Sequence, residues 1–238
     1  MIERTVKRSA KVGIFAVAHK PYWEQFPDLY DTLMKHHRCL CEKIVANGVE
    51  LVDFGMVDTN EQAYHVSKRI SNDIDVLFVN MVTYATSSTF APIIRTAPCP
   101  VILVALQPQL ALDYTKASTR MQLENDNICA VPEFTGVAVR MEKKVHDVIL
   151  GTLNNDTQAD AEIAEWCEIA KVLHGLKGAR FGLMGHVLEA MYDMHADPTA
   201  LSSAFGIHIP LLEIDDVIRH YQAVTEQEVL DQIGRAHV

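Results

Sequence analysis

Several features that mark common classes of protein are missing from this sequence. No apolar run approaches the ~20 residues that a membrane helix needs, so a membrane partner is not expected. The chain has no Gly-x-Gly-x-x-Gly after its first apolar run, no Gly-x-x-x-x-Gly-Lys-Ser/Thr and no Gly-x-Ser-x-Gly. The sequence therefore does not indicate a binding site for a dinucleotide or a nucleoside triphosphate, or the nucleophile elbow of a hydrolase. The sequence also has no internal repeat and no low-complexity tract.

Basic residues and cysteines are few as well. Lys and Arg number 21 against 31 Asp and Glu, and the resulting net charge of −10 repels a phosphate backbone, so no nucleic-acid partner is expected. Five cysteines, an odd number at irregular spacing, indicate reduced thiols rather than disulfides or a metal knuckle. The basic start lacks a small-residue cleavage site and is not typical of a signal peptide. These features predict a soluble, cytoplasmic protein.

Strand and helix patterns alternate along the first 176 residues, with short turns between them. This alternation is typical of an α/β fold, a doubly wound, Rossmann-like parallel sheet with helices on both faces. The paired His36 and His37 fall mid-helix without other ligand-type residues nearby, and are expected at the surface. The predicted strands cover residues 12–18, 49–54, 75–80, 100–105 and 147–152. The predicted helices cover residues 29–46, 58–72, a short stretch before Pro98, 133–144 and 156–176.

A Lys177-Gly178 break divides the chain into an N-terminal α/β domain, residues 1–176, and the start of a second α/β domain, residues 177–232. Strands are predicted in the second part at 179–184 and 207–212, but so short a part is not expected to be stable alone. The last residues, 233–238 (IGRAHV), match a translated sequencing adapter and interrupt a helix that has no stop signal. We therefore expect an artefact there, and a natural product that continues past Gln232.

The loop after the first predicted strand gathers several types of polar side chain. His19, Lys20, Tyr22 and Trp23 supply a base, a cation, a phenol and an indole. Ligands bind at the carboxyl ends of the strands in such sheets, and this mixture suits a sugar, with rings against C–H surfaces and polar tips for hydroxyls. The alternative is a capping loop whose rings close the edge of the core.

Two further groups of polar residues stand out. The aperiodic loop 113–132 is long for a connection, and its many hydrogen-bonding groups suit a polyhydroxylated ligand or a subunit contact, with a solvated surface loop as the alternative. Near the C-terminus, His186, Glu189 and Asp193 would share one face of a helix, followed by His195. Carboxylates and imidazoles there would suit Mn²⁺ or Zn²⁺, although a solvated helix side is the more common meaning of such a pattern.

At the level of motifs, the chain resembles the L-arabinose isomerase family within the L-fucose/L-arabinose isomerase-like fold. The strand at 13–18 runs into His19-Lys20-Pro21-Tyr22, where the family has a Gln-His-Leu-Tyr loop. Residues 125–134 (NDNICAVPEF) parallel the family's Asn-Gln-Thr-Ala-His-Gly-Gly-Arg-Glu-Phe, and Arg180-Phe181-Gly182 opens the central domain in both. The family's loop Gln and His fall at Asp126 and Cys129, which indicates a divergent branch.

The resemblance implies the amino-terminal part of a metal-dependent aldose–ketose isomerase, an intramolecular oxidoreductase acting on a small-molecule sugar and assembled as a trimer or hexamer. It implies that His19, Lys20, Tyr22, Asp126 and Cys129 contact the sugar, toward a neighbouring subunit. It also implies that the two catalytic glutamates and the Mn²⁺ ligands lie beyond this chain, so that the fragment alone is inactive.

Two alternatives to this interpretation remain open. One is a non-catalytic sugar-binding or sensor module on the same α/β scaffold. The other is a self-contained metalloenzyme that uses His186, Glu189 and Asp193. A longer reading of the gene distinguishes the first alternative from the isomerase, since glutamates and histidines at metal-site spacing downstream would favour an isomerase.

Overall fold

The computed structural model describes residues 9–236, with side chains up to residue 231. It divides into two compact units, Ser9–His174 and residues 175–236, which are treated separately below. The artefact expected at 233–238 lies outside the described side chains, and its last two residues lie outside the described chain altogether. Across the described residues, none of the helices combines the length and the apolar character needed to cross a membrane.

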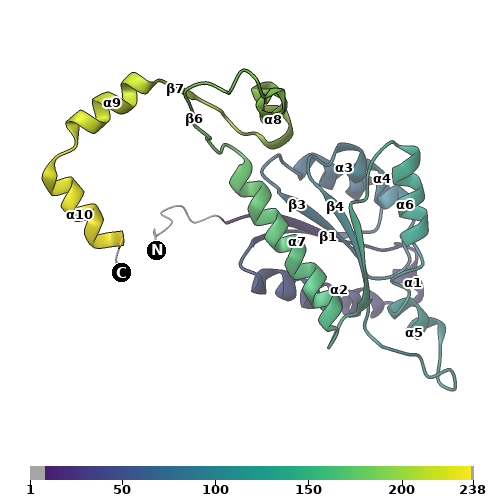
Figure 1. The fold of residues 1–238 in the computed structure, drawn as a ribbon. Coiled ribbons are helices and arrows are strands. Elements are labelled where there is room, and N and C mark those ends of the chain that lie inside the picture. The colour runs from purple at the N-terminus through teal and green to yellow at the C-terminus, as the bar shows by residue number, and fades with distance from the viewer. Residues whose placement is uncertain (1–8, 237–238) are drawn as a thin grey trace. The chain divides into compact units, whose positions relative to one another are not determined.

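The first unit is an α/β fold built on a five-stranded parallel sheet, which confirms the predicted fold class (Figure 1). Its strands lie in the order β2-β1-β3-β4-β5, and every neighbouring pair is parallel. Val12 of β1 lies opposite Leu51 of β2 on one side and Val76 of β3 on the other. The strands are β1 (Lys11–Val17), β2 (Glu50–Val57), β3 (Val76–Met81), β4 (Val101–Gln107) and β5 (Asp147–Thr152).

Helices connect these strands and cover both faces of the sheet (Figure 1). Their caps follow the local sequence: Thr59 accepts a hydrogen bond from the Gln62 N–H at the start of α3, and Gly48, with φ of 73°, lies just past the end of α2. The helices are α1 (Tyr22–Gln25), α2 (Leu29–Ala46), α3 (Asn60–Arg69), η1 (Ser87–Thr89), α4 (Ala91–Thr96), α5 (Thr119–Glu124), α6 (Val131–Arg140) and α7 (Thr157–Leu176).

Alternate residues of β1 feed two separate apolar layers. Val12 and Ile14 pack with α2 and α7, whereas Phe15 and Val17 pack with α3, α4 and α6. The α2 layer holds one departure from expectation, because His37, which was expected at the surface, is fully buried. His37 follows Leu33 by one helical turn and therefore lies on the apolar stripe of α2.

The carboxyl ends of the five strands meet at one edge of the sheet because the strands are parallel. The chain leaves β1 toward β2 on one side and leaves β3 toward β4 on the other. Such a reversal between neighbouring strands is a topological switch point, where open α/β sheets place their ligands. The loops after β1 and β3 therefore flank the most suitable position for a site.

The second unit has much less regular structure. Its two strands, β6 (Leu183–Met184) and β7 (Leu211–Leu212), pair in parallel, so the strands predicted at 179–184 and 207–212 are each reduced to two residues, preceded by a single bridge from Arg180 to His208. Many of its large apolar side chains are exposed, among them Leu211 at 70%. Its helices are η2 (Tyr192–Met194), α8 (Pro198–Phe205), α9 (Ile214–Ala223) and α10 (Glu226–Ala236).

Candidate functional site

Six side chains gather at the carboxyl edge of the sheet, around the switch point between β1 and β3. We call this group the edge cluster. His19 and Tyr22 follow β1, Tyr84 follows β3, and Glu133 lies in the first turn of α6, while the other two residues lie in the loop between α5 and α6. The members of the edge cluster are His19, Tyr22, Tyr84, Asp126, Cys129 and Glu133.

Three rings form the aromatic part of the edge cluster. The His19 imidazole lies edge-on to Tyr22, with ring centroids 5.2 Å apart and an angle of 79° between the planes. It also meets Tyr84 edge-on, at 6.3 Å and 72°. Edge-to-face contacts of this kind favour a fixed orientation of the rings. All three side chains are partly exposed, so their remaining surface is open to a ligand.

Glu133 ties the loop after β3 to helix α6. Its Oε1 accepts a hydrogen bond of 2.7 Å from the Ser87 N–H, and its Oε2 accepts one of 3.3 Å from the Tyr84 hydroxyl. Partial burial alone would raise the pKa of Glu133, but the bonds from Ser87 and Tyr84 outweigh it and lower that pKa. The carboxylate is therefore ionised at neutral pH and holds Tyr84 in place.

Asp126 and Cys129 form a second electrostatic pair in the edge cluster. Burial raises the pKa of Asp126, and a side-chain hydrogen bond with Cys129 offsets only part of that rise. Burial also raises the pKa of the Cys129 thiol, and the negative charge of Asp126 adds to the effect. The pKa of Tyr22 is raised by burial first and by Asp126 second, so all three groups lie within electrostatic reach of one another.

Buried amides hold the loop that carries Asp126 and Cys129. The Asn125 side chain accepts from the Gln109 N–H at 3.1 Å, and Asn127 Nδ2 donates to the Met81 carbonyl at 2.7 Å. Two polar atoms near the end of β3, Asn127 Oδ1 and Thr83 Oγ1, have no hydrogen-bond partner within the described chain. Both residues are buried, since Asn127 is 3% exposed and Thr83 is fully buried. Buried polar atoms are seldom left unpaired, so water or a ligand is expected beside them.

The structure thus brings together four of the five residues that the family resemblance implies as sugar contacts. Lys20 is the fifth; it is exposed, one residue beyond His19, and its backbone N–H donates to the Asp58 carbonyl. Sequence reasoning did not select Tyr84 or Glu133. Glu133 belongs to the motif at 125–134 and Tyr84 to a Thr/Ser-rich loop after a predicted strand, but neither signal indicates that the two would meet.

Much of the long loop 113–132 serves to anchor the chain. Arg120 donates to Asp28 at 3.0 Å and to the Thr32 hydroxyl at 3.1 Å, which fixes α5 against the start of α2. Tyr114, by contrast, is 89% exposed. Of the loop residues described above, only those from 125 to 129 reach the edge cluster.

In the second unit, the helix face expected to carry His186, Glu189 and Asp193 does not form. Residues 186–191 have no helical structure, and only a single 3₁₀ turn, η2, follows them. Helix α8 begins later, where the Asp197 carboxylate accepts the Thr199 N–H, and Gly185 with φ of 75° precedes the irregular stretch. The predicted spacing therefore brings no ligand set together.

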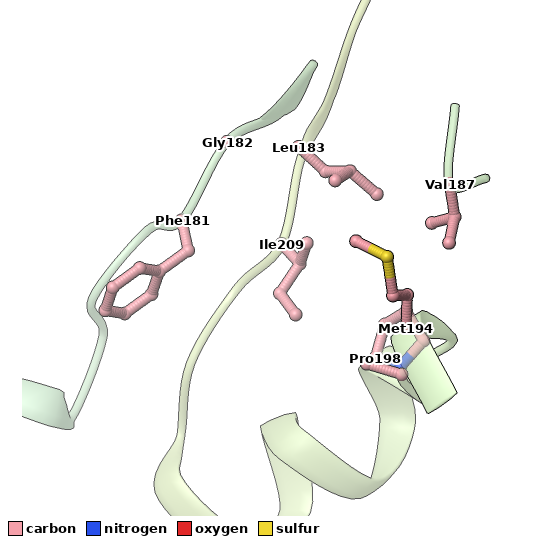
Figure 2. A pocket seen from close by; sticks show the side chains of 8 residues that line it. Phe181, Gly182, Leu183, Val187, Met194, Pro198 and Ile209 are labelled. Carbon is pink, nitrogen blue, oxygen red and sulfur yellow. The ribbon is translucent and has the colours of Figure 1, made fainter. Parts of the chain in front are cut away.

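The second unit also contains a cavity of about 210 Å³ (Figure 2). Figure 2 shows apolar side chains around it, among them Leu183 of β6, Ile209 two residues before β7 and Pro198 at the start of α8. A sugar needs hydrogen-bonding partners, which these side chains lack, so the edge cluster is the better candidate for a polar ligand. The cavity is lined by Phe181, Gly182, Leu183, Val187, Met194, Ala196, Pro198 and Ile209.

No family model matches this chain, and no curated protein matches it either. The geometry of the edge cluster is consequently the basis for the functional argument that follows.

The pairing of Asp126 with Cys129 has a direct chemical consequence. Asp126→Asn removes the negative charge beside the thiol, so the pKa of Cys129 should fall and its thiolate fraction rise at pH 8. We expect alkylation of Cys129 by iodoacetamide to become about two- to fivefold faster, because the lower nucleophilicity of a more acidic thiolate offsets part of the gain. Mass spectrometry of the Cys129 peptide measures the rate.

Asp113→Asn is the control for this experiment, since Asp113 is a carboxylate of the same loop that does not pair with Cys129. It should leave the rate unchanged. Equal rates for the wild-type chain and Asp126→Asn would show that the two side chains do not interact.

Proposed function

We propose that the first unit binds a small-molecule sugar at the edge cluster. The observation that carries this proposal is the convergence of three rings and two carboxylates at the switch point of the sheet. Ligands of doubly wound sheets bind at that position. No nucleotide-type glycine loop competes for it, and the negative charge of the carboxylates disfavours a phosphorylated ligand.

The chemistry of the edge cluster suits a polyhydroxylated molecule in particular. Ring surfaces of His19, Tyr22 and Tyr84 offer contacts for sugar C–H groups, while phenol and imidazole tips remain available for hydrogen bonds. Sugar hydroxyls both donate and accept, so one of them could donate a hydrogen bond to the carboxylate of Asp126. A purely apolar or purely anionic ligand would leave part of this set unpaired.

We further propose that the chain is the amino-terminal part of an aldose–ketose isomerase similar to L-arabinose isomerase. The match of motifs at 19–22 and 125–134 supports this, because both motifs supply members of the edge cluster. In this proposal the catalytic glutamates come from residues outside the chain, and assembly as a trimer or hexamer brings the edge cluster to a neighbouring subunit. The exposed apolar side chains of the second unit are consistent with additional polypeptide packing against them.

The Mn²⁺ of such an isomerase does not fit the residues of the edge cluster. Both oxygens of Glu133 already accept hydrogen bonds, and the thiol of Cys129 beside Asp126 is a softer ligand than Mn²⁺ prefers. The role proposed for this chain is therefore to orient the sugar, without a contact to the metal.

A non-catalytic sugar-binding or sensor module is the second candidate. It uses the same edge cluster, in which Glu133 is an anchor bonded to Ser87 and Tyr84 rather than a group free to exchange a proton with a substrate. A longer reading of the gene would decide between the two candidates. Glutamates and histidines at metal-ligand spacing there would indicate the isomerase, and their absence would indicate the binding module.

Sugar binding by the full chain tests the proposal. We expect saturation-transfer NMR to detect L-arabinose, L-fucose or D-galactose, and His19→Ala to weaken the affinity about 5- to 150-fold. That range corresponds to the ~1–3 kcal/mol cost of leaving a buried polar partner unsatisfied. Tyr22→Phe, which removes one hydroxyl and keeps the ring, should have a smaller effect.

His65→Ala is the matched control, because His65 is an exposed histidine on α3. It should bind sugars as the wild-type chain does. If no sugar binds, or if His19→Ala and His65→Ala behave alike, the edge cluster is not a sugar site. A fall in melting temperature of several degrees for His19→Ala, with binding unchanged, would assign the loop a structural role instead.

A further inference from the structure

Three side chains in the first unit, separate from the edge cluster, place one donor atom each within 4.8 Å of the others. His37 and Cys41 lie one turn apart on α2, and Asp53 lies on the facing edge strand β2. His37 Nε2 is 3.0 Å from Asp53 Oδ1 and 3.6 Å from Cys41 Sγ. An imidazole nitrogen thus lies between a thiol and a carboxylate.

These separations are close to those between the ligands of a tetrahedral zinc ion. With Zn–N, Zn–S and Zn–O bonds of about 2.0, 2.3 and 2.0 Å, a tetrahedral angle puts nitrogen and sulfur about 3.5 Å apart, and nitrogen and oxygen about 3.3 Å apart. The nitrogen–sulfur distance agrees with the first value. The nitrogen–oxygen distance is about 0.3 Å shorter than the second, a difference that a small rotation of the carboxylate removes.

The backbone of β2 is shaped around Asp53. The pairing of β1 with β2 shifts register between Ile14 and Ala16, which marks a bulge, and Gly55 at this point has φ of 78°. A residue other than glycine would have a strained backbone at this position. The Gly55 N–H donates to Asp53 Oδ1 at 2.7 Å, so the bulge directs the carboxylate toward α2.

A second partner orients the imidazole from the other side. His37 is fully buried, and its Nδ1 lies 3.1 Å from the side-chain amide of Asn80 on β3. Ligating histidines are held in this way, with the ring nitrogen that does not bind the metal paired to a side-chain or backbone partner. The Asp53 side chain is 40% exposed, which leaves a path for an ion and for a water molecule.

We propose that His37, Cys41 and Asp53 form a binding site for Zn²⁺, with solvent as the fourth ligand. A thiolate, an imidazole and a carboxylate form a donor set for a borderline-soft ion and disfavour Mg²⁺, Ca²⁺ or Mn²⁺. The ion would join α2 to the edge strand β2. This site is independent of the sugar-binding proposal, so either can fail without the other.

Binding requires a defined exchange of protons. Burial first and Asp53 second raise the pKa of Cys41 to about 12, so the thiol is protonated at neutral pH in the metal-free protein. The thiol gives up its proton when the sulfur–zinc bond forms. With Nε2 bound to the ion, the His37 proton would lie on Nδ1, where the Asn80 amide, turned over, would accept it through its oxygen. One proton per ion is therefore released to solvent.

Titration of the EDTA-treated full chain with Co²⁺ tests the proposal. We expect one ion per chain, the visible ligand-field bands of a tetrahedral site, a thiolate-to-cobalt charge-transfer band, and loss of all these bands when Zn²⁺ is added. Calorimetry in two buffers of different protonation enthalpy should count one released proton. Cys41→Ser should abolish the charge-transfer band and weaken Zn²⁺ binding by more than the 10–100-fold that loss of an outer-shell partner costs.

Cys39→Ser is the matched control, since Cys39 lies on the same helix and is not among the three donors. It should bind as the wild-type chain does. Asp53→Asn keeps an oxygen for the Gly55 N–H but removes the charge, and should weaken binding while the chain remains folded by circular dichroism. Absence of binding to the wild-type chain, or equal binding by Cys41→Ser, would overturn the proposal and leave a hydrogen-bonded Asn80–His37–Asp53 network.

Discussion

Replacing Phe134 with alanine should lower the free energy of unfolding of the first unit by about 3–5 kcal/mol, the cost of removing a buried aromatic ring. The Phe134 ring is fully buried and stacks on Phe90, with centroids 4.7 Å apart and 17° between the planes. It lies where α4 and α6 meet the sheet, so no solvent would fill the space it leaves. Urea denaturation followed by tryptophan fluorescence measures the change.

Fluorescence is the suitable probe because both tryptophans, Trp23 and Trp166, belong to the first unit. The signal therefore reports this unit even if the second unfolds separately. Val139→Ala is the control on the same helix: Val139 is 74% exposed, and its loss should change the free energy of unfolding by less than about 0.5 kcal/mol. A similar small effect for Phe134→Ala would show that α6 does not pack on the sheet as described.

The sheet of the first unit could be predicted because its signals are local. Each strand is a short apolar run between turn or helix patterns, and such runs form buried parallel strands. The last of them, predicted at residues 147–152, coincides with β5. Helix boundaries were less certain: the helix predicted at 58–72 is α3, Asn60–Arg69, since capping by Thr59 and the extended Ile70 set its ends.

The second unit could not be predicted in the same way, because its regular structure depends on few contacts. Strands of two residues leave most of the apolar runs at 179–184 and 207–212 outside any sheet. The helical spacing of His186, Glu189 and Asp193 likewise had no apolar stripe to fix it against a core. Periodicity predicts an element only where packing is available to stabilise it.

The edge cluster was partly predictable from the rule that ligands bind where parallel strands end. That rule selected His19 and Tyr22 directly after β1. Tyr84 and Glu133 are 49 residues apart and meet through a hydrogen bond between different elements, which no sequence spacing indicates. Their contact depends on how the loop after β3 folds back on α6.

Helix α2 shows how a signal in the sequence was misread. Leu33 and Leu40 mark its apolar stripe, and His37 lies four residues after the first and three before the second. Reading histidine as polar placed His37 at the surface, although its side chain is fully buried. Position on the stripe was the better guide, because a buried polar side chain is acceptable when Asn80 and Asp53 satisfy both of its nitrogens.

His37→Ala should therefore destabilise the metal-free first unit by about 2–4 kcal/mol. The substitution leaves a cavity in the α2 layer, and it leaves the Asn80 amide buried without its partner, which alone costs about 1–3 kcal/mol. Asp53 contributes less to the loss because its side chain is partly exposed and water can replace the imidazole. Urea denaturation in EDTA, followed by tryptophan fluorescence, measures this change in the free energy of unfolding without any contribution from a bound ion.

His36→Ala provides the comparison, one residue away on the same helix. His36 is only partly buried, and its Nδ1 has no hydrogen-bond partner among the described residues, so its removal breaks no bond at that atom. We expect a change of less than about 1 kcal/mol for His36→Ala. Equal effects of the two substitutions would mean that the network of Asn80, His37 and Asp53 does not stabilise the fold, since only one of the two histidines belongs to it.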